Sequence, residues 1–367
     1  MINQNRSHKI LLVGDCLAGG GAEKVHAQLS IYFQKNGIEI SNCIFSDWVT
    51  YGYSGSLLNL GEINPNGFFM IRRMKRFLAF RKFVKRNHFD HIIDFRMRTN
   101  SLLEVLISKF VYGQNAIYTV HSGILGFYFP KSTVLSRFIY NQKKIIAVSK
   151  AIKQEIINRK FAGNVDFIHN PADLKSAAQK SVAFEVNQSK YIIAAGRMND
   201  DVKQFDKLIV AYSNSDLPQK NIRLLLLGDG KNQELYKEIA RNLGIDKSVI
   251  FKNFVENPFP YFRNALFLVL SSKNEGFGNV IVEALSTGTP AVAFDCFAGP
   301  NEIILNEHNG LLVENQNFDK LTEAMNRMVN DAKLHEICKQ NAIQTVQKFD
   351  IEIIGKQWLE YLKINVS

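Results

Sequence analysis

The chain has 367 residues, 46% of them hydrophobic, which suffices for the cores of two globular domains, and no apolar run has the length of a signal peptide or of a membrane span. Its four cysteines lie far apart without paired spacing, which excludes a disulfide framework and a zinc site and predicts buried thiols in a reducing compartment. Residues 1–170 carry 23 Lys and Arg against 10 Asp and Glu, whereas the rest carry 22 against 24, so the first half predicts an anionic partner, either nucleic acid or an acidic membrane surface.

Short apolar or β-branched runs alternate along the chain with longer segments of helical period. They predict strands at 10–13, 38–45, 91–94, 116–120 and 144–148, and a second series at 191–195, 222–227, 249–251, 266–270 and 291–294. This rhythm is typical of parallel sheets with crossover helices. We therefore predict an α/β fold of two Rossmann-like, doubly wound parallel-sheet domains that face a cleft.

The two series of strands are separated by the turn Asn170-Pro171-Ala172-Asp173 and a polar stretch at 175–190, which we interpret as a linker. The expected domains are an N-terminal one at 1–172 and a C-terminal one at 173–348. Helical periodicity at 317–329, 334–347 and 351–364 predicts a helical tail. Its last part, 349–367, is expected to pack back on the N-terminal domain.

Glycines follow the first strand and begin the first helix at Gly19, Gly20 and Gly21, where the backbone can approach a ligand closely. This is not a dinucleotide fingerprint, because Lys24 stands where the third glycine would be required. His121 follows the strand at 116–120 and should lie at the same sheet edge, where it can hydrogen-bond a ligand. A lone histidine is more often structural, so both interpretations stay open.

The segment 68–86 is the most basic part of the chain. Apolar residues at helical spacing, such as Met70, Met74 and Leu78, alternate with cations. Such a helix can lie on an anionic membrane, or it can face the core while its cations are solvated. Phe and Met among the cations suit a membrane better than a nucleic-acid groove, so we predict membrane contact and no nucleic acid. The cations concerned are Arg72, Arg73, Lys75, Arg76, Arg81, Lys82, Lys85 and Arg86.

Two clusters in the second half could bind an anion. Arg197 and Lys203 follow the strand at 191–195, where two cations can stabilise the charge that develops on a diphosphate leaving group without a metal. Gly228 begins a turn at the end of the next strand. The run 272–283 follows another strand and opens a helix whose free N–H groups can bind phosphate. Glu275 and Glu283 could instead be solvated charges, and the two cations could be ordinary surface residues.

Together these segments resemble the retaining glycosyltransferases of the GT-B fold, in particular the family 4 group that builds bacterial surface polysaccharides and glycolipids. The specific match runs from Glu275 to Glu283, which follows that group's Glu-x7-Glu motif with Gly-Phe-Gly-Asn inside it. Arg197 with Lys203 matches the phosphate-binding pair, and His121 falls at the position of the active-site histidine. Lys203-Gln204 departs from the Lys-Gly of relatives.

The resemblance implies a metal-independent hexosyltransferase without a cofactor, which takes a hexose or N-acetylhexosamine from a nucleoside diphosphate, with uridine favoured. Arg197 and Lys203 would bind the diphosphate, Glu283 the ribose and Glu275 the transferred sugar, with His121 also in the active site. The donor site would further include Gly20, Gly21, Gly196, Gly228, Gly276, Phe277, Gly278, Asn279 and Val280.

The N-terminal domain would bind a glycan or lipid-linked acceptor, in lipopolysaccharide or other polysaccharide synthesis. The protein is expected to be cytoplasmic and peripheral at the inner face of the membrane. Two alternatives stay open. A nucleotide-sugar epimerase or hydrolase of the same architecture would use the donor site without an acceptor, and a basic membrane-binding or nucleic-acid-binding protein would use only the first half.

Overall fold

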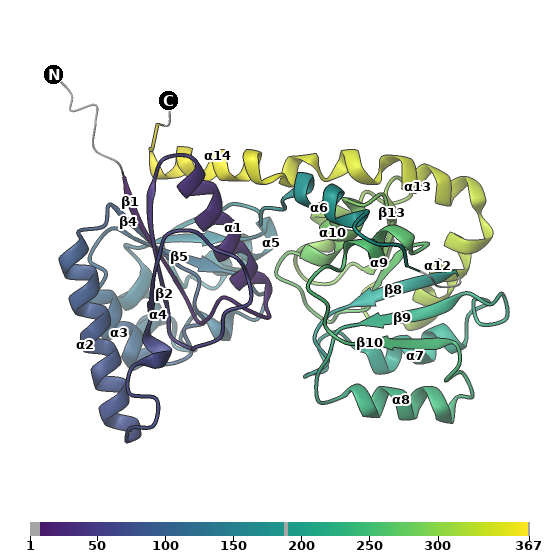
Figure 1. Cartoon of the computed structure of the whole chain (residues 1–367), viewed down its shortest axis with the longest axis horizontal. Helices are drawn as coiled ribbons and strands as arrows, with labels where there is room; N and C mark the ends of the chain where they lie inside the picture. Colours follow the sequence, from purple (N-terminus) through teal and green to yellow (C-terminus); the bar gives the residue numbers. More distant parts are fainter. Residues whose placement is uncertain (1–7, 187–189, 366–367) are drawn as a thin grey trace. The chain divides into compact units, whose positions relative to one another are not determined.

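The computed structural model describes residues 8–186 and 190–365, and the chain divides into two compact units (Figure 1). The N-terminal unit takes in Met1–Pro171 and Ile351–Ser367, and the C-terminal unit takes in Ala172–Asp350. Each unit is built on one parallel sheet with helices on its faces. The predicted fold class, two Rossmann-like parallel-sheet domains, is confirmed.

The N-terminal sheet has seven strands in the order β3-β2-β1-β4-β5-β6-β7. Its inner strands are buried on both faces, which is why they appear in the sequence as continuous apolar runs. The edge strands β3 and β7 are short and only half apolar, and they were not predicted. The strands are β1 (Lys9–Gly14), β2 (Glu39–Ile44), β3 (Ser56–Asn59), β4 (His91–Asp94), β5 (Ala116–Val120), β6 (Lys144–Ala147) and β7 (Asn164–Phe167).

Helices cover both faces of this sheet, because the chain winds outward from β1 in both directions and parallel crossovers are as a rule right-handed. On one face, α1 (Gly21–Lys35) packs with α14 (Ile351–Leu362), and Leu29 and Trp358 share a core with Ile10 of β1. On the other face, Phe80 and Tyr112 meet edge to face. The helices on that side are α2 (Phe69–Asn87), α3 (Ser101–Phe110) and α4 (Thr133–Tyr140), and α5 (Lys150–Asn158) precedes β7.

The C-terminal sheet has six strands in the order β10-β9-β8-β11-β12-β13. They are β8 (Tyr191–Ala195), β9 (Arg223–Leu227), β10 (Val249–Lys252), β11 (Leu268–Leu270), β12 (Ala291–Phe294) and β13 (Gly310–Val313), the last of which was not predicted. The helices are α6 (Leu174–Ser181), α7 (Phe205–Ser213), α8 (Gln233–Asn242), α9 (Phe259–Asn264), α10 (Asn279–Leu285), α11 (Pro300–Ile303), α12 (Phe318–Asn330) and α13 (Ala332–Thr345).

The interpretation of 175–190 as a linker is wrong in its first part, which forms α6. Asp173 caps this helix, because its carboxylate accepts a hydrogen bond from the Ser176 backbone N–H at 2.8 Å. All four cysteines are buried, as predicted.

The strand order reverses at β1 and β4 in one sheet and at β8 and β11 in the other. In open parallel sheets, ligands bind outside the carboxyl ends of the strands at such a reversal. The loops that follow these four strands are therefore the first places to look for a site.

Candidate functional site

In the C-terminal unit, the two predicted clusters both lie at the strand-order reversal. Arg197 comes two residues after the end of β8, and Glu275 lies in the loop between β11 and α10. Because β8 and β11 are hydrogen-bonded neighbours that run parallel, their carboxyl ends emerge side by side. The fold thus brings together segments that are far apart in the sequence.

Lys203 and Glu275 form the central contact of this edge. The Lys203 ammonium lies 2.6 Å from a Glu275 carboxylate oxygen, and the two side chains are only 20% and 13% exposed. The Ser271 hydroxyl donates to the Lys203 carbonyl at 2.7 Å, and the Lys273 N–H donates to the Val202 carbonyl at 2.9 Å. These bonds fasten the loop after β8 to the loop after β11 and fix where the lysine lies.

Two glycines make room for this arrangement. A Cβ at Gly196 would lie 2.9 Å from Cε of Lys203, so the lysine stem passes directly over that glycine. A Cβ at Gly228 would lie 2.0 Å from the Gly196 carbonyl oxygen, and the φ of Gly228 is +139°, a conformation that favours glycine. Gly196 and Gly228 therefore serve close backbone packing at the ends of β8 and β9.

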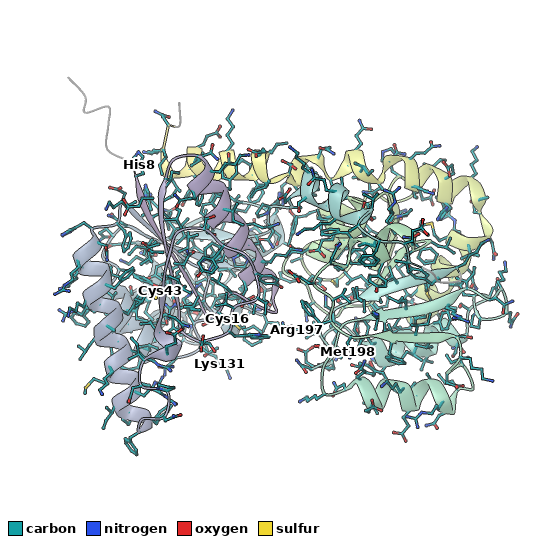
Figure 2. The ribbon with its side chains drawn as sticks, viewed as in Figure 1. His8, Cys16, Cys43, Lys131, Arg197 and Met198 are labelled. Carbon is teal, nitrogen blue, oxygen red and sulfur yellow. The ribbon has the colours of Figure 1, made fainter. Side chains whose placement is uncertain are left out.

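Arg197 is the exposed cation of the edge, and Figure 2 shows it beside Met198. Met198 is fully buried and anchors the loop, while the Arg197 guanidinium makes no hydrogen bond or ion pair with the residues that the structure describes. A guanidinium in this position can form paired hydrogen bonds with phosphate oxygens.

The run from Gly276 to Val280 forms the turn into α10. Gly278 has φ +98°, in the left-handed region, and precedes the first residue of the helix. The Phe277 ring is buried and meets Phe349 edge to face at 5.0 Å, so its side chain serves the core. A Cβ at Gly299 would lie 1.9 Å from the Phe277 carbonyl oxygen. This supporting role of Gly299 was not predicted.

The remaining members of the C-terminal cluster are placed by α10. Asn279 is the first residue of the helix, and Glu283 lies one turn later, half-buried. Val280 is also half-buried. Asn279 thus belongs to the first turn, where the helix dipole favours anionic ligands, whereas Glu283 lies beyond that turn, in the second half of this short helix.

His121 lies in the N-terminal unit, directly after β5, and is half-buried. Thr119 donates its hydroxyl proton to the Asp94 carbonyl, so its oxygen must accept the 2.9 Å hydrogen bond from Nε2–H of His121. This leaves Nδ1 as an acceptor. Burial and the charge of Arg98 lower the pKa of His121 to about 3, so the ring is neutral near pH 7.

The glycine loop of the N-terminal unit has a structural role of its own. The Glu23 carboxylate folds back over the start of α1, and a Cβ at Gly20 would lie 2.1 Å from its Oε2 atom. A ligand phosphate at Gly20 and Gly21 would therefore meet a carboxylate already at this helix end. The involvement of these two glycines in donor binding stays a prediction.

A buried ionic network at the reversal of the N-terminal sheet was missed at the sequence level. Arg96 lies 2.7 Å from Asp94 and 3.3 Å from Glu104, and all three side chains are almost fully buried. Arg98, also buried, donates to the Thr119 carbonyl at 3.0 Å. The only available signal was the charged run after the apolar strand β4.

Helix α2 differs from the amphipathic core helix that was one of the two alternatives. Only Phe80 and Val84 of this helix are buried, whereas Met70, Met74 and Leu78 are exposed. Phe68 and Phe69 just before and at its start are exposed as well, Phe68 to 72%. The first three turns of α2 therefore present an apolar surface to the outside.

The cations of α2 fall into three groups. Arg72 donates to the Pro65 carbonyl at 2.9 Å and Arg76 to the Gly61 carbonyl at 2.7 Å, so these two hold the helix to the preceding loop. Arg81 is half-buried. The exposed cations are Arg73, Lys75, Lys82, Lys85 and Arg86. Within the described ranges, no helix is both long and apolar enough to pass through a bilayer.

The comparisons with known proteins cover almost the whole chain. Residues 19–176 match the family model described as Glycosyltransferase Family 4, and residues 175–345 match Glycosyl transferases group 1. The amylovoran biosynthesis glycosyltransferase AmsD of Erwinia amylovora is 21% identical over 97% of this chain and 99% of its own length.

A second relative is N-acetylgalactosamine-N,N'-diacetylbacillosaminyl-diphospho-undecaprenol 4-alpha-N-acetylgalactosaminyltransferase of Campylobacter jejuni, which is 28% identical over 54% of this chain. That alignment spans about half of the relative, 53% of its length. Among solved structures, Anabaena HepE in complex with UDP superposes with a TM-score of 0.74 at 21% identity and covers 97% of this chain and 99% of that one. At this identity the likeness shows the fold.

Proposed function

Because this chain belongs to the GT-B glycosyltransferases, with a family 4 N-terminal domain and a group 1 C-terminal domain, we propose that it transfers a hexose or N-acetylhexosamine from a nucleoside diphosphate sugar to a glycan or lipid-linked acceptor in surface polysaccharide synthesis. The observation that carries the proposal is the Lys203–Glu275 pair, which joins the loop after β8 to the loop after β11 at the strand-order reversal. A uridine nucleotide is favoured because HepE, of the same fold, is a UDP complex.

The proposed donor site uses the charges of this edge. Arg197 and Lys203 bind the diphosphate, Glu283 binds the ribose and Glu275 lies by the transferred sugar. When the bond between the sugar C1 and the phosphate oxygen breaks, negative charge grows on the diphosphate, and the two cations stabilise it. The acceptor oxygen bonds to C1 from the same face, and its proton passes to the leaving phosphate oxygen, so the configuration at C1 is retained.

The reaction so written requires no metal and no cofactor, which is a second part of the proposal. Among residues 8–186 and 190–365, no three His, Cys, Asp or Glu side chains lie close enough together to hold a metal ion. A single carboxylate with a nucleotide can still bind Mg²⁺, so the direct test is activity in excess EDTA.

The experiment that tests the donor site is thermal unfolding with UDP, GDP and ADP in the presence of EDTA. UDP is expected to raise the melting temperature of the wild type, by linkage, and to do so much less for Lys203→Ala. Lys320→Ala is the matched control, because Lys320 forms a 2.7 Å ion pair with Glu314 on the surface of the same domain. No shift with any nucleotide, or equal shifts in both variants, would overturn the proposed site.

A transferase must also be separated from a hydrolase or an epimerase that uses the same donor site. We expect the UDP-sugar to be consumed only when a lipid-linked or glycan acceptor is present. Release of free sugar, or conversion to an epimeric nucleotide sugar, at the same rate without acceptor would favour the alternative.

A membrane-bound acceptor requires the enzyme to reach a bilayer, and we propose that α2 docks on an anionic membrane at its inner face. The exposed apolar surface of its first three turns can enter the headgroup region, and each exposed cation contributes about 1 kcal/mol near acidic lipid. Neither feature is explained by packing within the N-terminal unit.

Co-sedimentation with vesicles tests this surface. Arg73→Glu combined with Lys75→Glu is expected to reduce binding to vesicles rich in phosphatidylglycerol at least tenfold. Lys131→Glu combined with Lys160→Glu changes the net charge equally and uses exposed lysines away from α2 (Figure 2 labels Lys131), so binding should fall much less. Equal losses in both double variants would contradict docking through α2, and comparable binding to RNA would favour the nucleic-acid alternative.

A further inference from the structure

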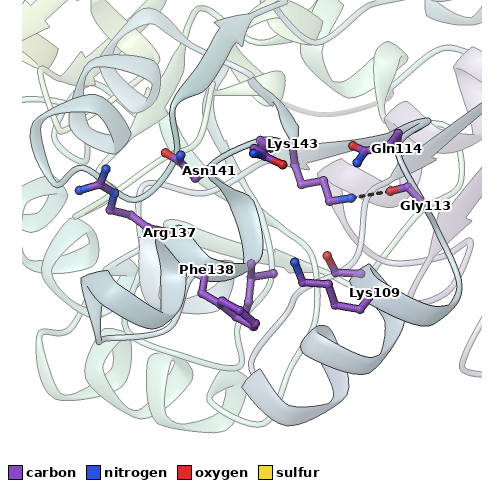
Figure 3. A pocket seen from close by; sticks show the side chains of 10 residues that line it. Lys109, Gly113, Gln114, Arg137, Phe138, Asn141 and Lys143 are labelled. Atoms are coloured by element: carbon purple, nitrogen blue, oxygen red, sulfur yellow. Dashed lines mark hydrogen bonds between the residues drawn. The ribbon is translucent and has the colours of Figure 1, made fainter.

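The N-terminal unit contains a hollow of about 360 Å³ that the donor site does not explain (Figure 3). It is formed by the ends of α3 and α4 and by the turns that lead into β5 and β6. It therefore lies at the amino ends of these strands, whereas His121 follows the carboxyl end of β5. The two features are on opposite edges of the same sheet.

Three cations and several amides line this hollow, and no carboxylate does, among the residues that the structure describes. The cations are Lys109 from the end of α3, Arg137 from α4 and Lys143 from the turn before β6. Figure 3 shows Lys109 and Lys143 extending into the same space. The amides are Gln114, Asn141 and Gln142.

The cations also lack acidic neighbours along the chain. Residues 105–154 contain seven Lys and Arg and no Asp or Glu. Lys143 is only 7% exposed, and burial together with the charge of Lys109 lowers its pKa. Two ammonium groups that repel each other in a partly dry site would both be stabilised by an anion between them.

Part of this arrangement has a structural explanation. Cations near the last turn of a helix interact favourably with its dipole, and Lys143 donates a hydrogen bond to the Gly113 carbonyl. The Lys109 ammonium lies 4.7 Å from the centre of the Phe138 ring. These contacts explain where each lysine rests, but they do not explain why three cations and three amides surround one open hollow.

We propose that this hollow binds a phosphate monoester or diphosphate group, either as a free anion or as the headgroup of a lipid. Charge-assisted hydrogen bonds from Lys109 and Arg137 and the amide N–H groups supply the donors that phosphate oxygens require. Beside the hollow, Phe110 and Phe138 are exposed, Phe138 to 59%, which suits an apolar chain attached to the phosphate. The proposal does not rest on the donor site, which lies in the other unit.

The test follows hydrogen exchange in the full-length chain, because this measurement reports on each segment separately. One arm adds inorganic phosphate at constant ionic strength, and the other adds vesicles that contain phosphatidic acid. Protection of 108–115 and 137–143 by phosphate supports a free anion. Protection of the same segments only by the vesicles supports a lipid headgroup. Lys203→Ala should leave both results unchanged.

The double variant Lys109→Gln with Arg137→Gln should raise at least tenfold the concentration of phosphate, or of vesicle lipid, that gives half of the maximal protection. Lys131→Gln with Lys160→Gln, which removes the same charge elsewhere on this unit, should not. The proposal is overturned if neither arm protects these segments, or if both double variants respond alike.

Discussion

The two sheets have the same winding and reverse at the same relative position, but they treat the charges at that reversal differently. In the N-terminal unit, Arg96 is buried between Asp94 and Glu104. In the C-terminal unit, Lys203 and Glu275 are partly exposed, and Arg197 has no side-chain partner in the described part of the chain. One edge satisfies its ions internally, while the other leaves cations available to a ligand.

The comparison teaches that topology alone does not make a binding edge. Burying an ion pair costs solvation free energy, which the fold recovers only when each charge keeps its partner. A cation that a ligand must reach has to stay near solvent and form only a weak ion pair with its neighbouring carboxylate. The first arrangement suits stability, and the second suits the binding of a diphosphate.

The largest expected effect concerns the edge of the N-terminal sheet, where the ions are buried and paired. Arg96→Met would leave two buried carboxylates without their ion-pair partner, so we expect the free energy of unfolding to fall by about 3–5 kcal/mol in urea titrations at pH 7. Arg327→Met removes an exposed 2.7 Å ion pair with Glu307 and should change stability little. Similar losses in the two variants would remove the contrast between buried and exposed charges.

Acid should weaken the N-terminal unit. Burial lowers the pKa of His26 from 6.5 to about 4, so as the pH falls from about 6.5 to about 4 the unfolded chain binds a proton that the folded chain excludes. The contribution of His26 to the free energy of unfolding is therefore fully present above about pH 6.5 and is lost as the pH falls through this window. The loss amounts to about 3 kcal/mol. Burial raises the pKa of Asp15, which opposes the loss at the acidic end.

Urea titrations between pH 7 and pH 4 measure this dependence. His26→Gln, which cannot take up a proton, should make the slope shallower, while His121, whose pKa is also lowered, continues to contribute to it. A stability that stays constant over the window, or a slope unchanged in the variant, would show that His26 does not control it.

The role of the C-terminal edge can be measured with Glu275→Gln, which keeps the shape of the side chain and removes its charge. Since Lys203 would no longer be shared with a carboxylate, UDP should bind as tightly as before or more tightly in calorimetry. Turnover should fall about tenfold to a hundredfold, or about 1.4–2.7 kcal/mol in barrier height, if the carboxylate acts on the transferred sugar. Weakened UDP binding, as large as in Lys203→Ala, would mean that the pair only holds the loops together.

The smallest expected effect concerns Gln204, which has φ +51° at the position where the sequence departs from the Lys-Gly pattern of the family that it resembles. Gln204→Gly relieves the left-handed conformation but loses a buried side chain whose amide hydrogen-bonds with the Gln316 amide. We expect the free energy of unfolding to change by less than about 1 kcal/mol and the UDP-induced shift to persist. Loss of the rise in melting temperature with UDP would show that the Gln204 side chain itself shapes the C-terminal edge.

The inner strands of both sheets could be predicted because buried parallel strands are continuous apolar runs. The edge strand Asn164–Phe167 could not, since it is short, and its alternate residues are polar and exposed. Helix α6 was missed for a related reason, because a polar helix stabilised by one capping aspartate resembles a linker.

The site was predictable as separate motifs but not as one assembly. No spacing rule links Lys203 to Glu275, because only the pairing of β8 with β11 brings them together. The apolar pattern of α2 was visible, but a periodic pattern does not say what the apolar surface contacts. Helix α14 has a comparable pattern and is a core element, with Ile354 and Trp358 buried.

That helix has a consequence for synthesis on the ribosome. The core that Ile10 and Leu29 share with Trp358 stays incomplete until residues 351–362 have emerged, although the sheet beneath it is finished at Phe167. At about 5–20 residues per second, the gap lasts on the order of ten seconds or more. During that interval the C-terminal sheet can form while the apolar face of α1 stays uncovered, so the nascent chain is open to chaperone binding until its last helix docks.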